Sequence, residues 1–305
     1  MTQVGAPRHD PIPIGEVAAP PFARLPDPGA LFARRSARLR ALADGHDLKP
    51  YLLFLAGLCS VQHAIQADLP AIALPAADAI ARGREFAMPP LDRGRFTADH
   101  ACDATFERLL AAAASCAMTP AAEAALRRLC AVDATTRDGM VRAVLADSVP
   151  VEAIAEHVFV AAALQVHYAR LAAGLDAASL VPVGDGACPA CGGPPMSSVV
   201  VGWPGAHGTR FCACALCGTL WNYVRIKCTV CGSTKGISFA EVEGSPGTAK
   251  AETCDSCRSY VKVLYQDKDP LLDPLADDVA SLGLDLLVRE TGMRRGAVNH
   301  FLLGY

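Results

Sequence analysis

The chain has 305 residues, of which 52% are hydrophobic and 19% charged, and its formal net charge is −3. This length suits about two domains with a sizeable buried core. The charge balance argues against a bulk electrostatic attraction to nucleic acid or to an anionic membrane. No uninterrupted apolar stretch of about 18 residues occurs, and residues 1–50 lack the apolar core of a secretory signal. We therefore expect a cytoplasmic protein with no membrane insertion.

The first half of the chain has the pattern of a helical domain. Residues 1–28 contain many prolines and are expected to form an extended arm, and the helical domain is expected over 29–180. Alanine, which has the highest helix propensity, dominates this region. Apolar periodicity and Pro or Gly boundaries predict helices, in chain order, at 31–43, 51–66, 102–118, 121–131, 134–147 and 151–174.

The composition changes near residue 180, where Gly, Pro, Cys, Val and Thr replace the helix formers. Short apolar alternations at 198–201, 219–225, 236–242 and 260–265 predict short antiparallel strands. Such strands, separated by Gly-rich turns, are typical of small metal-binding modules rather than of a second helical domain.

The helical pattern returns after Pro270. Asp273 is a predicted N-cap, with Pro274 at the first helical position. Leu275, Val279, Leu282 and Leu286 then recur at helical spacing, and Gly292 is the predicted stop. We expect the remaining residues, 293–305, to form a short tail on the surface.

Eight of the thirteen cysteines form four CxxC pairs between positions 188 and 257. The pairs repeat with a period of forty residues, so that 188/191 and 214/217 recur as 228/231 and 254/257. Such a repeat indicates a duplicated module. Without a predicted route to an oxidising compartment, CxxC pairs indicate metal or redox chemistry rather than disulfides.

Two CxxC turns brought together by strands offer four thiolates in a tetrahedral arrangement, which suits zinc or iron. The repeat favours one site made by Cys188, Cys191, Cys214 and Cys217 and another made by Cys228, Cys231, Cys254 and Cys257. Spacing alone leaves open an interleaved pairing of first pair with third and second with fourth. Three pairs are followed by a glycine, which lets backbone amides turn toward a sulfur; Arg258 replaces it in the fourth pair.

We accordingly expect an α+β protein. An N-terminal all-α domain precedes two tandem rubredoxin-like or zinc-ribbon modules, at 185–226 and 227–268, and a C-terminal helix with its tail occupies 270–305. The metal sites also supply the stability that a small module with few large apolar side chains lacks, because a structural site contributes on the order of 10 kcal/mol to folding.

Three other interpretations of the cysteines fit the sequence less well. Chance placement of core residues does not explain four pairs with matched gaps. A redox-active dithiol usually lies on a thioredoxin-like βαβ pattern, which is absent. Catalysis at the metal is disfavoured because four cysteines leave no open coordination position, and no other catalytic motif is present, so we do not expect an enzyme.

The remaining cysteines and the helical histidines are interpreted as structural. Cys212 is expected to be a buried neighbour of the first site rather than a ligand. The others are expected to be core residues because they lie on apolar or alanine-rich helices: Cys59, Cys102, Cys116, Cys130, His63, His157 and His167.

Nucleic acid is the standard alternative partner of a zinc ribbon. Residues 186–268 hold eight Lys or Arg against five Asp or Glu, and two divalent ions with eight thiolates bring this module to about −1. Phosphate binding needs a clear positive excess. We expect the basic residues instead to neutralise the thiolate clusters or to contact an acidic protein partner: Arg210, Arg225, Lys227, Lys235, Arg258 and Lys262. Trp221 and Tyr223 are expected to cover a CxxC turn rather than to stack on bases.

Several blocks resemble the FdhE family, the formate dehydrogenase accessory proteins. They are RFCACALCGTLWNYVRIKCTVCG at 210–232, AETCDSCRSYVK at 251–262, the helix at 276–287, and Gln165-Val-His167. The resemblance covers the whole chain and is strongest over 185–290. It departs at Asn299-His300, where the family leads us to expect Asn-Pro.

This resemblance implies a cytoplasmic maturation factor that is not a subunit of the finished enzyme. It implies binding to the catalytic subunit of formate dehydrogenase and rubredoxin-type iron at the cysteine pairs, two ions in all, with zinc as the alternative metal. A rubredoxin-like electron carrier is a further alternative, but it leaves the large helical domain unexplained. A homo-oligomer is compatible with the sequence.

Overall fold

The computed structural model describes residues 20–302, so most of the expected N-terminal arm lies outside the described residues. All six helices predicted in the first half are present. The helices of this half are α1 (Pro28–Leu42), α2 (Lys49–Ala64), α3 (Ala77–Glu85), α4 (His100–Ala113), α5 (Pro120–Cys130), α6 (Ala134–Leu145) and α7 (Ile154–Ala173). The sequence did not indicate α3, because this helix buries no residue and therefore has no apolar stripe facing a core.

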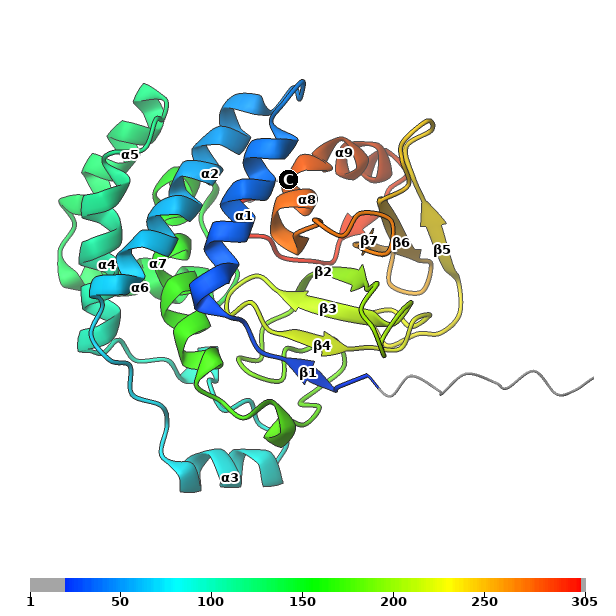
Figure 1. Ribbon diagram of the computed structural model, residues 1–305, viewed down its shortest axis with the longest axis horizontal. Helices are drawn as coiled ribbons and strands as arrows, with labels where there is room; N and C mark the ends of the chain where they lie inside the picture. Colours follow the sequence, from blue (N-terminus) through cyan, green and yellow to red (C-terminus); the bar gives the residue numbers. More distant parts are fainter. Residues whose placement is uncertain (1–19, 303–305) are drawn as a thin grey trace, which may run out of the picture.

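Short side-chain caps set where these helices begin. Asp27 accepts a hydrogen bond from the backbone N–H of Gly29 at the start of α1, and Asp99 and Asp133 accept equivalent bonds at the starts of α4 and α6. Helix α7 is the centre of the domain, with its apolar side chains buried along nearly its whole length. Helices α4, α5 and α6 pack against it (Figure 1).

The second half is built on one sheet shared by both cysteine modules. The described strands are β1 (Ala23–Arg24), β2 (Pro195–Val200), β3 (Arg210–Cys214), β4 (Leu220–Asn222), β5 (Ile237–Ala240), β6 (Ala249–Cys254), β7 (Ser259–Tyr265) and β8 (Arg294–Arg295). Their order is β1-β4-β3-β2-β7-β6-β5, with β8 beside β7. The α+β class is confirmed, and the strands within each module pair antiparallel as expected. In addition, β2 of the first module pairs with β7 of the second in parallel, and this pairing joins the two modules.

Four strands had no prediction, for identifiable reasons. All residues of β3 are buried, so it lacks the alternation of a half-exposed strand. Strand β6 mixes polar and small residues. Strands β1 and β8 have only two residues each, and β1 takes the end of the expected arm into the sheet by pairing Ala23 with Trp221.

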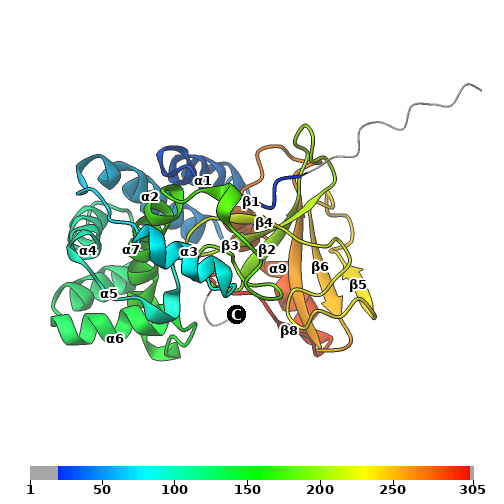
Figure 2. The same ribbon diagram turned by 90° about the horizontal axis from the view of Figure 1, so that it is seen from below.

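The helices of the first half gather on one side of the molecule and the strands on the other, with the helical segment after Pro270 lying beside the strands (Figures 1 and 2). One apolar core nevertheless runs through both halves, since the same cluster contains Phe32 and Phe159 from the helices, Trp221 from the sheet and Phe301 from the C-terminal segment. The helical half and the first cysteine module therefore fold around shared residues.

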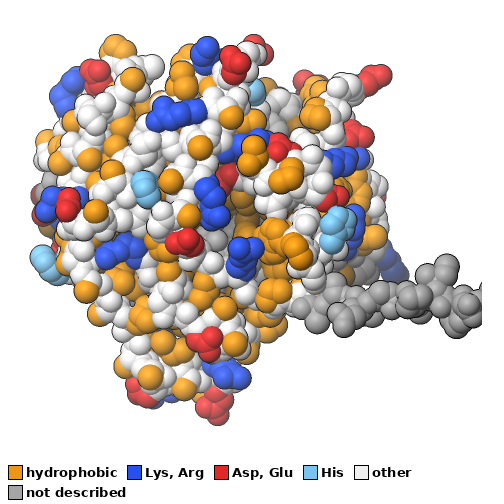
Figure 3. Space-filling view, viewed as in Figure 1, with side chains coloured by type: hydrophobic (Ala, Val, Ile, Leu, Met, Phe, Trp, Pro, Cys, Tyr) orange, Lys and Arg blue, Asp and Glu red, His pale blue; other side chains and the backbone are white. Residues whose placement is uncertain are grey.

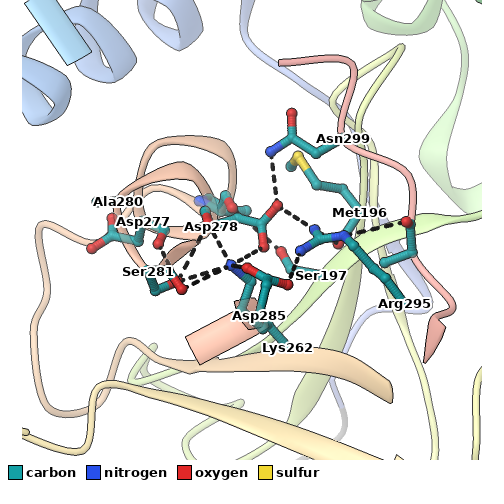
Figure 4. A network of polar contacts seen from close by, with 12 residues as sticks. Met196, Ser197, Lys262, Asp277, Asp278, Ala280, Ser281, Asp285, Arg295 and Asn299 are labelled. Atoms are coloured by element: carbon teal, nitrogen blue, oxygen red, sulfur yellow. Dashed lines mark hydrogen bonds and ion pairs between the residues drawn. The ribbon is translucent and has the colours of Figure 1, made fainter. Parts of the chain in front are cut away.

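The predicted C-terminal helix is two short helices, α8 (Pro274–Ala280) and α9 (Leu282–Glu290). Asp273 caps α8 as expected, its carboxylate accepting from the N–H groups of Leu275 and Ala276. The break falls at Ser281, because the buried Lys262 ammonium donates to the Asp278 carbonyl, 2.5 Å away, and to the Ser281 hydroxyl at 3.1 Å (Figure 4). A carbonyl bound to Lys262 in this way favours termination of the helical ladder.

The expectation of a surface tail is wrong for the part that the structure describes. Phe301 and Leu302 are buried, and Asn299 donates to the Asp278 carboxylate at 2.7 Å. Tyr51 of α2 also donates to the Phe301 carbonyl at 2.6 Å. The tail therefore lies between the helical half and the sheet, because its apolar side chains complete the shared core.

On the face shown in Figure 3, acidic and basic side chains are interspersed with apolar ones and no single sign of charge dominates. Over residues 20–302, none of the helices combines the length and apolar character needed to cross a bilayer.

Candidate metal centres

Each module presents its first cysteine pair on a tight turn after a loop and its second pair where one strand turns into the next. The turn of the first module is closed by hydrogen bonds from Cys188 N–H to the Gly193 carbonyl and from Gly192 N–H to the Cys188 carbonyl, both 2.8 Å. Gly192, Gly218 and Gly232 all have positive φ angles, and Arg258 adopts the same left-handed conformation with φ 54°. Glycine is favoured there because a Cβ crowds the backbone.

The structure brings the eight sulfurs together as two groups. Cys188, Cys191, Cys214 and Cys217 form site one, and Cys228, Cys231, Cys254 and Cys257 form site two, with the four Sγ atoms of each group within 4.8 Å of one another. The grouping follows the sequence repeat and not the interleaved alternative.

The sulfur spacing fits a single bound ion in each group. In site one the Cys188–Cys217 and Cys191–Cys214 Sγ atoms lie 3.6 and 3.4 Å apart. In site two both corresponding distances, Cys228–Cys257 and Cys231–Cys254, are 3.7 Å. A tetrahedron of sulfurs about 2.3 Å from a central ion has edges of roughly 3.8 Å. The chemistry of four thiolates suits zinc or iron, and no position is left for water or substrate.

Hydrogen bonds within each group favour one thiolate. The neighbouring thiols hold the pKa of the Cys214 thiol well below its usual range. Burial by itself would raise the pKa of the Cys254 thiol. Hydrogen bonds from the N–H groups of Cys257 and Ser256 and from the adjacent thiols outweigh burial and lower this pKa to about 7. A bound ion would replace the protons shared among the sulfurs.

Site one lies in the interface with the helical half, and all four of its cysteines are buried. The N–H of Arg93 donates to the Cys191 carbonyl at 3.2 Å, and the Arg93 guanidinium forms an ion pair with Asp147 at 2.5 Å. A Cβ on Gly193 would lie 3.6 Å from both an Arg93 guanidinium nitrogen and Cys191 Sγ, so this cation lies beside the first site. Sequence reasoning missed Arg93, because nothing in the local pattern indicates contact with a cysteine about a hundred residues away.

Site two lies away from the helical half and is more open. Cys228 and Cys254 are buried, Cys257 is half-buried and Cys231 is exposed. Tyr223 donates its hydroxyl to the Cys228 carbonyl at 3.1 Å and so covers the first turn of this site, as expected for this side chain. Trp221 is buried opposite Cys212 on the neighbouring strand.

Two of the six cations expected to neutralise the thiolates or to meet a partner are instead used inside the protein. Arg210 is buried and forms two hydrogen bonds, of 2.9 and 3.0 Å, with the Glu252 carboxylate of the other module. Lys262 is buried against Asp278 and Asp285, at 3.0 and 2.5 Å. These contacts join the modules to each other and to the C-terminal helices.

The other cysteines and histidines only partly follow the core interpretation. Cys212 is buried, 3.7 Å from the Ser198 hydroxyl, and lies outside both sulfur groups. The prediction of a core position is confirmed for four residues that are buried: Cys59, Cys102, His157 and His167. Cys116 is half-buried. The prediction is wrong for Cys130 and His63, which are exposed. In α2, His63 lies close to the end of the helix, where apolar spacing no longer implies burial.

Two four-cysteine groups on one sheet, packed against a helical half, define a double zinc-ribbon or rubredoxin-like protein. Sequence models of three FdhE regions match the chain in order, "FdhE, N-terminal" over 20–185, "FdhE, central domain" over 187–225 and "FdhE, C-terminal domain" over 226–302. The chain belongs to the FdhE family.

Individual relatives agree over nearly the full length. The chain is 46% identical to "Protein FdhE homolog" of Rhizobium meliloti, covering 97% of each chain, and 36% identical to that of Pseudomonas aeruginosa, covering 89% of this chain and 90% of the relative. The crystal structure of the FdhE protein from Pseudomonas aeruginosa superimposes with a TM-score of 0.83 at 35% identity, over 93% of this chain and 99% of the other.

Proposed function

We propose that this protein is a cytoplasmic accessory factor for the production of active formate dehydrogenase, and that it acts by binding the catalytic subunit of that enzyme. Membership of the FdhE family supports a role in the production of active formate dehydrogenase. The observation that favours binding over catalysis is that each sulfur group offers four cysteines and no open position for a reactant.

In this proposal each sulfur group holds one metal ion, iron of the rubredoxin type, with zinc as the alternative. Site one would be held by Cys188, Cys191, Cys214 and Cys217, and site two by Cys228, Cys231, Cys254 and Cys257. The ions supply rigid cross-links between strands, and iron would add a one-electron change of charge. The chain's own residues provide the surface that the partner contacts.

The metal is tested by purifying the full-length protein without oxygen and measuring metal content and visible absorption. Two iron ions per chain with thiolate-to-iron absorption are expected. Two zinc ions and no visible bands would select the alternative, and metal-free folded protein would refute both.

Partner binding is tested in a strain that lacks the gene and makes a tagged version of this protein. We expect the catalytic subunit to co-purify with the wild type and with Cys130→Ser, which changes an exposed cysteine outside both sites. The double variant Cys214→Ser/Cys217→Ser is expected to lose both co-purification and formate dehydrogenase activity. If this variant loses its metal yet restores activity fully, the metal sites do not organise the surface.

A further inference from the structure

The two sulfur groups have the same internal geometry, so their matched cysteines can be compared directly. In site two the first turn is closed by Cys228 N–H to the Ser233 carbonyl at 2.8 Å and Gly232 N–H to the Cys228 carbonyl at 3.0 Å, as in the first turn of site one. The sulfur spacings also agree within a few tenths of an ångström. Any difference in behaviour between the sites must therefore come from their surroundings.

Both turns of site one are covered by the helical half. At the first turn, Leu91 N–H donates to the Ala190 carbonyl at 2.9 Å, and a Cβ on Gly192 would lie 3.1 Å from Pro89. At the second turn, the Gln165 side-chain amide of α7 donates to the Ala215 carbonyl at 2.9 Å. An attacking molecule cannot reach a sulfur here unless the two halves separate.

Site two has no such cover. Among residues 20–302, no hydrogen bond from the helices of the first half reaches its turns at 228–232 and 254–258. Cys231 is exposed, whereas the matched Cys191 is fully buried. The turn that carries Cys231 is flanked by the exposed Ile226 and Val230. The asymmetry is therefore greatest at Cys231, and the half-buried Cys257 differs from its buried match Cys217 in the same direction.

The exposure of Cys231 has a chemical consequence. Ligand substitution at a four-thiolate ion requires an incoming donor to approach the ion while one sulfur departs, and a buried site must first open locally. We propose that site two is an exchangeable centre in which Cys231 is the ligand that yields to an incoming thiol, while site one is a permanent cross-link between the two halves.

This inference rests on the metal binding proposed above. In the exchange, the bond between the ion and Cys231 Sγ breaks, a bond to the incoming sulfur forms, and the proton of the incoming thiol passes to Cys231. The charge of the centre is unchanged and no electron is transferred. Cys257, which is half-buried, is positioned to leave second.

The test uses the full-length protein loaded with zinc. Dithiothreitol is the attacking thiol, and 4-(2-pyridylazo)resorcinol reports the zinc set free. One zinc per chain should leave at least about tenfold faster than the other, a ratio equivalent to about 1.4 kcal/mol. Equal rates would overturn the inference. Fewer than two zinc ions in the starting protein would instead refute the proposed metal sites, and with them this inference.

Alkylation identifies which site empties first, without any substitution. After the fast phase, N-ethylmaleimide followed by mass spectrometry should label Cys231 and its three partners in site two but none of the site-one cysteines. Cys130, which is exposed and outside both sites, should label at once and serves as the internal control. Labelling of site one before site two would overturn the inference.

A matched pair of variants separates loss of exchange from loss of fold. Cys231→Ser should remove the fast phase, keep the slow zinc ion and change the melting temperature little. Cys191→Ser, at the equivalent position of site one, should lower the melting temperature strongly, because it loosens the interface between the halves. If Cys231→Ser keeps the fast phase and loses the slow one, the assignment of the sites is reversed and the inference is wrong.

Discussion

Lys262 lies in a buried cluster of four charges that we expect to govern stability (Figure 4). Its ammonium lies between the carboxylates of Asp278 and Asp285, and Arg295 contacts the same two carboxylates at 2.6 and 2.5 Å. Lys262, Asp278 and Asp285 side chains are 0% exposed and Arg295 is 7% exposed. Two positive and two negative charges therefore balance with almost no access to water.

The substitution Lys262→Met keeps most of the side-chain volume and removes one positive charge. Asp278 and Asp285 then share a single Arg295, and one negative charge stays buried without a partner. Breaking a buried pair in this way costs about 3–5 kcal/mol. At about 2–4 °C per kcal/mol, the melting temperature should fall by roughly 6–20 °C.

The assay is thermal unfolding of the metal-loaded protein, followed by circular dichroism. The double variant Lys262→Met/Asp285→Asn restores the charge balance and should recover about half of the loss. Arg82→Ala, which breaks an ion pair whose side chains are 66% and 78% exposed, is the control and should change stability by less than about 0.5 kcal/mol. A Lys262→Met loss below about 1 kcal/mol, or a double variant no better than the single one, would show that unpaired charge is not the cause.

Three further predictions concern pH, backbone conformation and metal removal. Burial lowers the pKa of His167 from 6.5 to about 4. Below pH 6.5 the unfolded chain binds a proton at this histidine that the folded protein does not. The free energy of unfolding therefore decreases as the pH is lowered. In urea unfolding, the free energy of unfolding of His167→Gln should decrease by about 2 kcal/mol less than that of the wild type between pH 7.5 and pH 5. An equal decrease in both proteins would contradict the burial effect. Gly186→Ala would place a Cβ 1.9 Å from the Thr229 carbonyl oxygen at φ 67°, and it should lower the free energy of unfolding by more than about 2 kcal/mol. The control Gly45→Ala has a similar φ of 66° but open space around the Cβ, and should lower it by only about 1 kcal/mol. Equal melting temperatures of the two variants would refute the clash. If both sites hold ions, their removal with a chelator at acidic pH should alter tryptophan fluorescence and the strand signal but leave most of the helical circular dichroism. Loss of both signals together would show that the helical half depends on the ions.

The sequence alone determined the local features of this protein. The forty-residue repeat of CxxC pairs predicted which four sulfurs lie together, because a duplicated module repeats its own contacts. Apolar periodicity with Pro or Gly boundaries predicted six of the helices of the first half, and Asp273 with Pro274 predicted the start of the C-terminal helix, since these signals act within one or two turns of chain.

Only the tertiary structure decided features that depend on distant segments. The parallel pairing of β2 with β7 merges the modules into one sheet. Lys262, which lies on β7, interrupts the C-terminal helix by donating to the Asp278 carbonyl. The difference between the buried Cys191 and the exposed Cys231 is of the same kind. Both occupy equivalent places in the repeat, and the difference arises because the helical half packs over one module and not the other, which no local pattern of residues records.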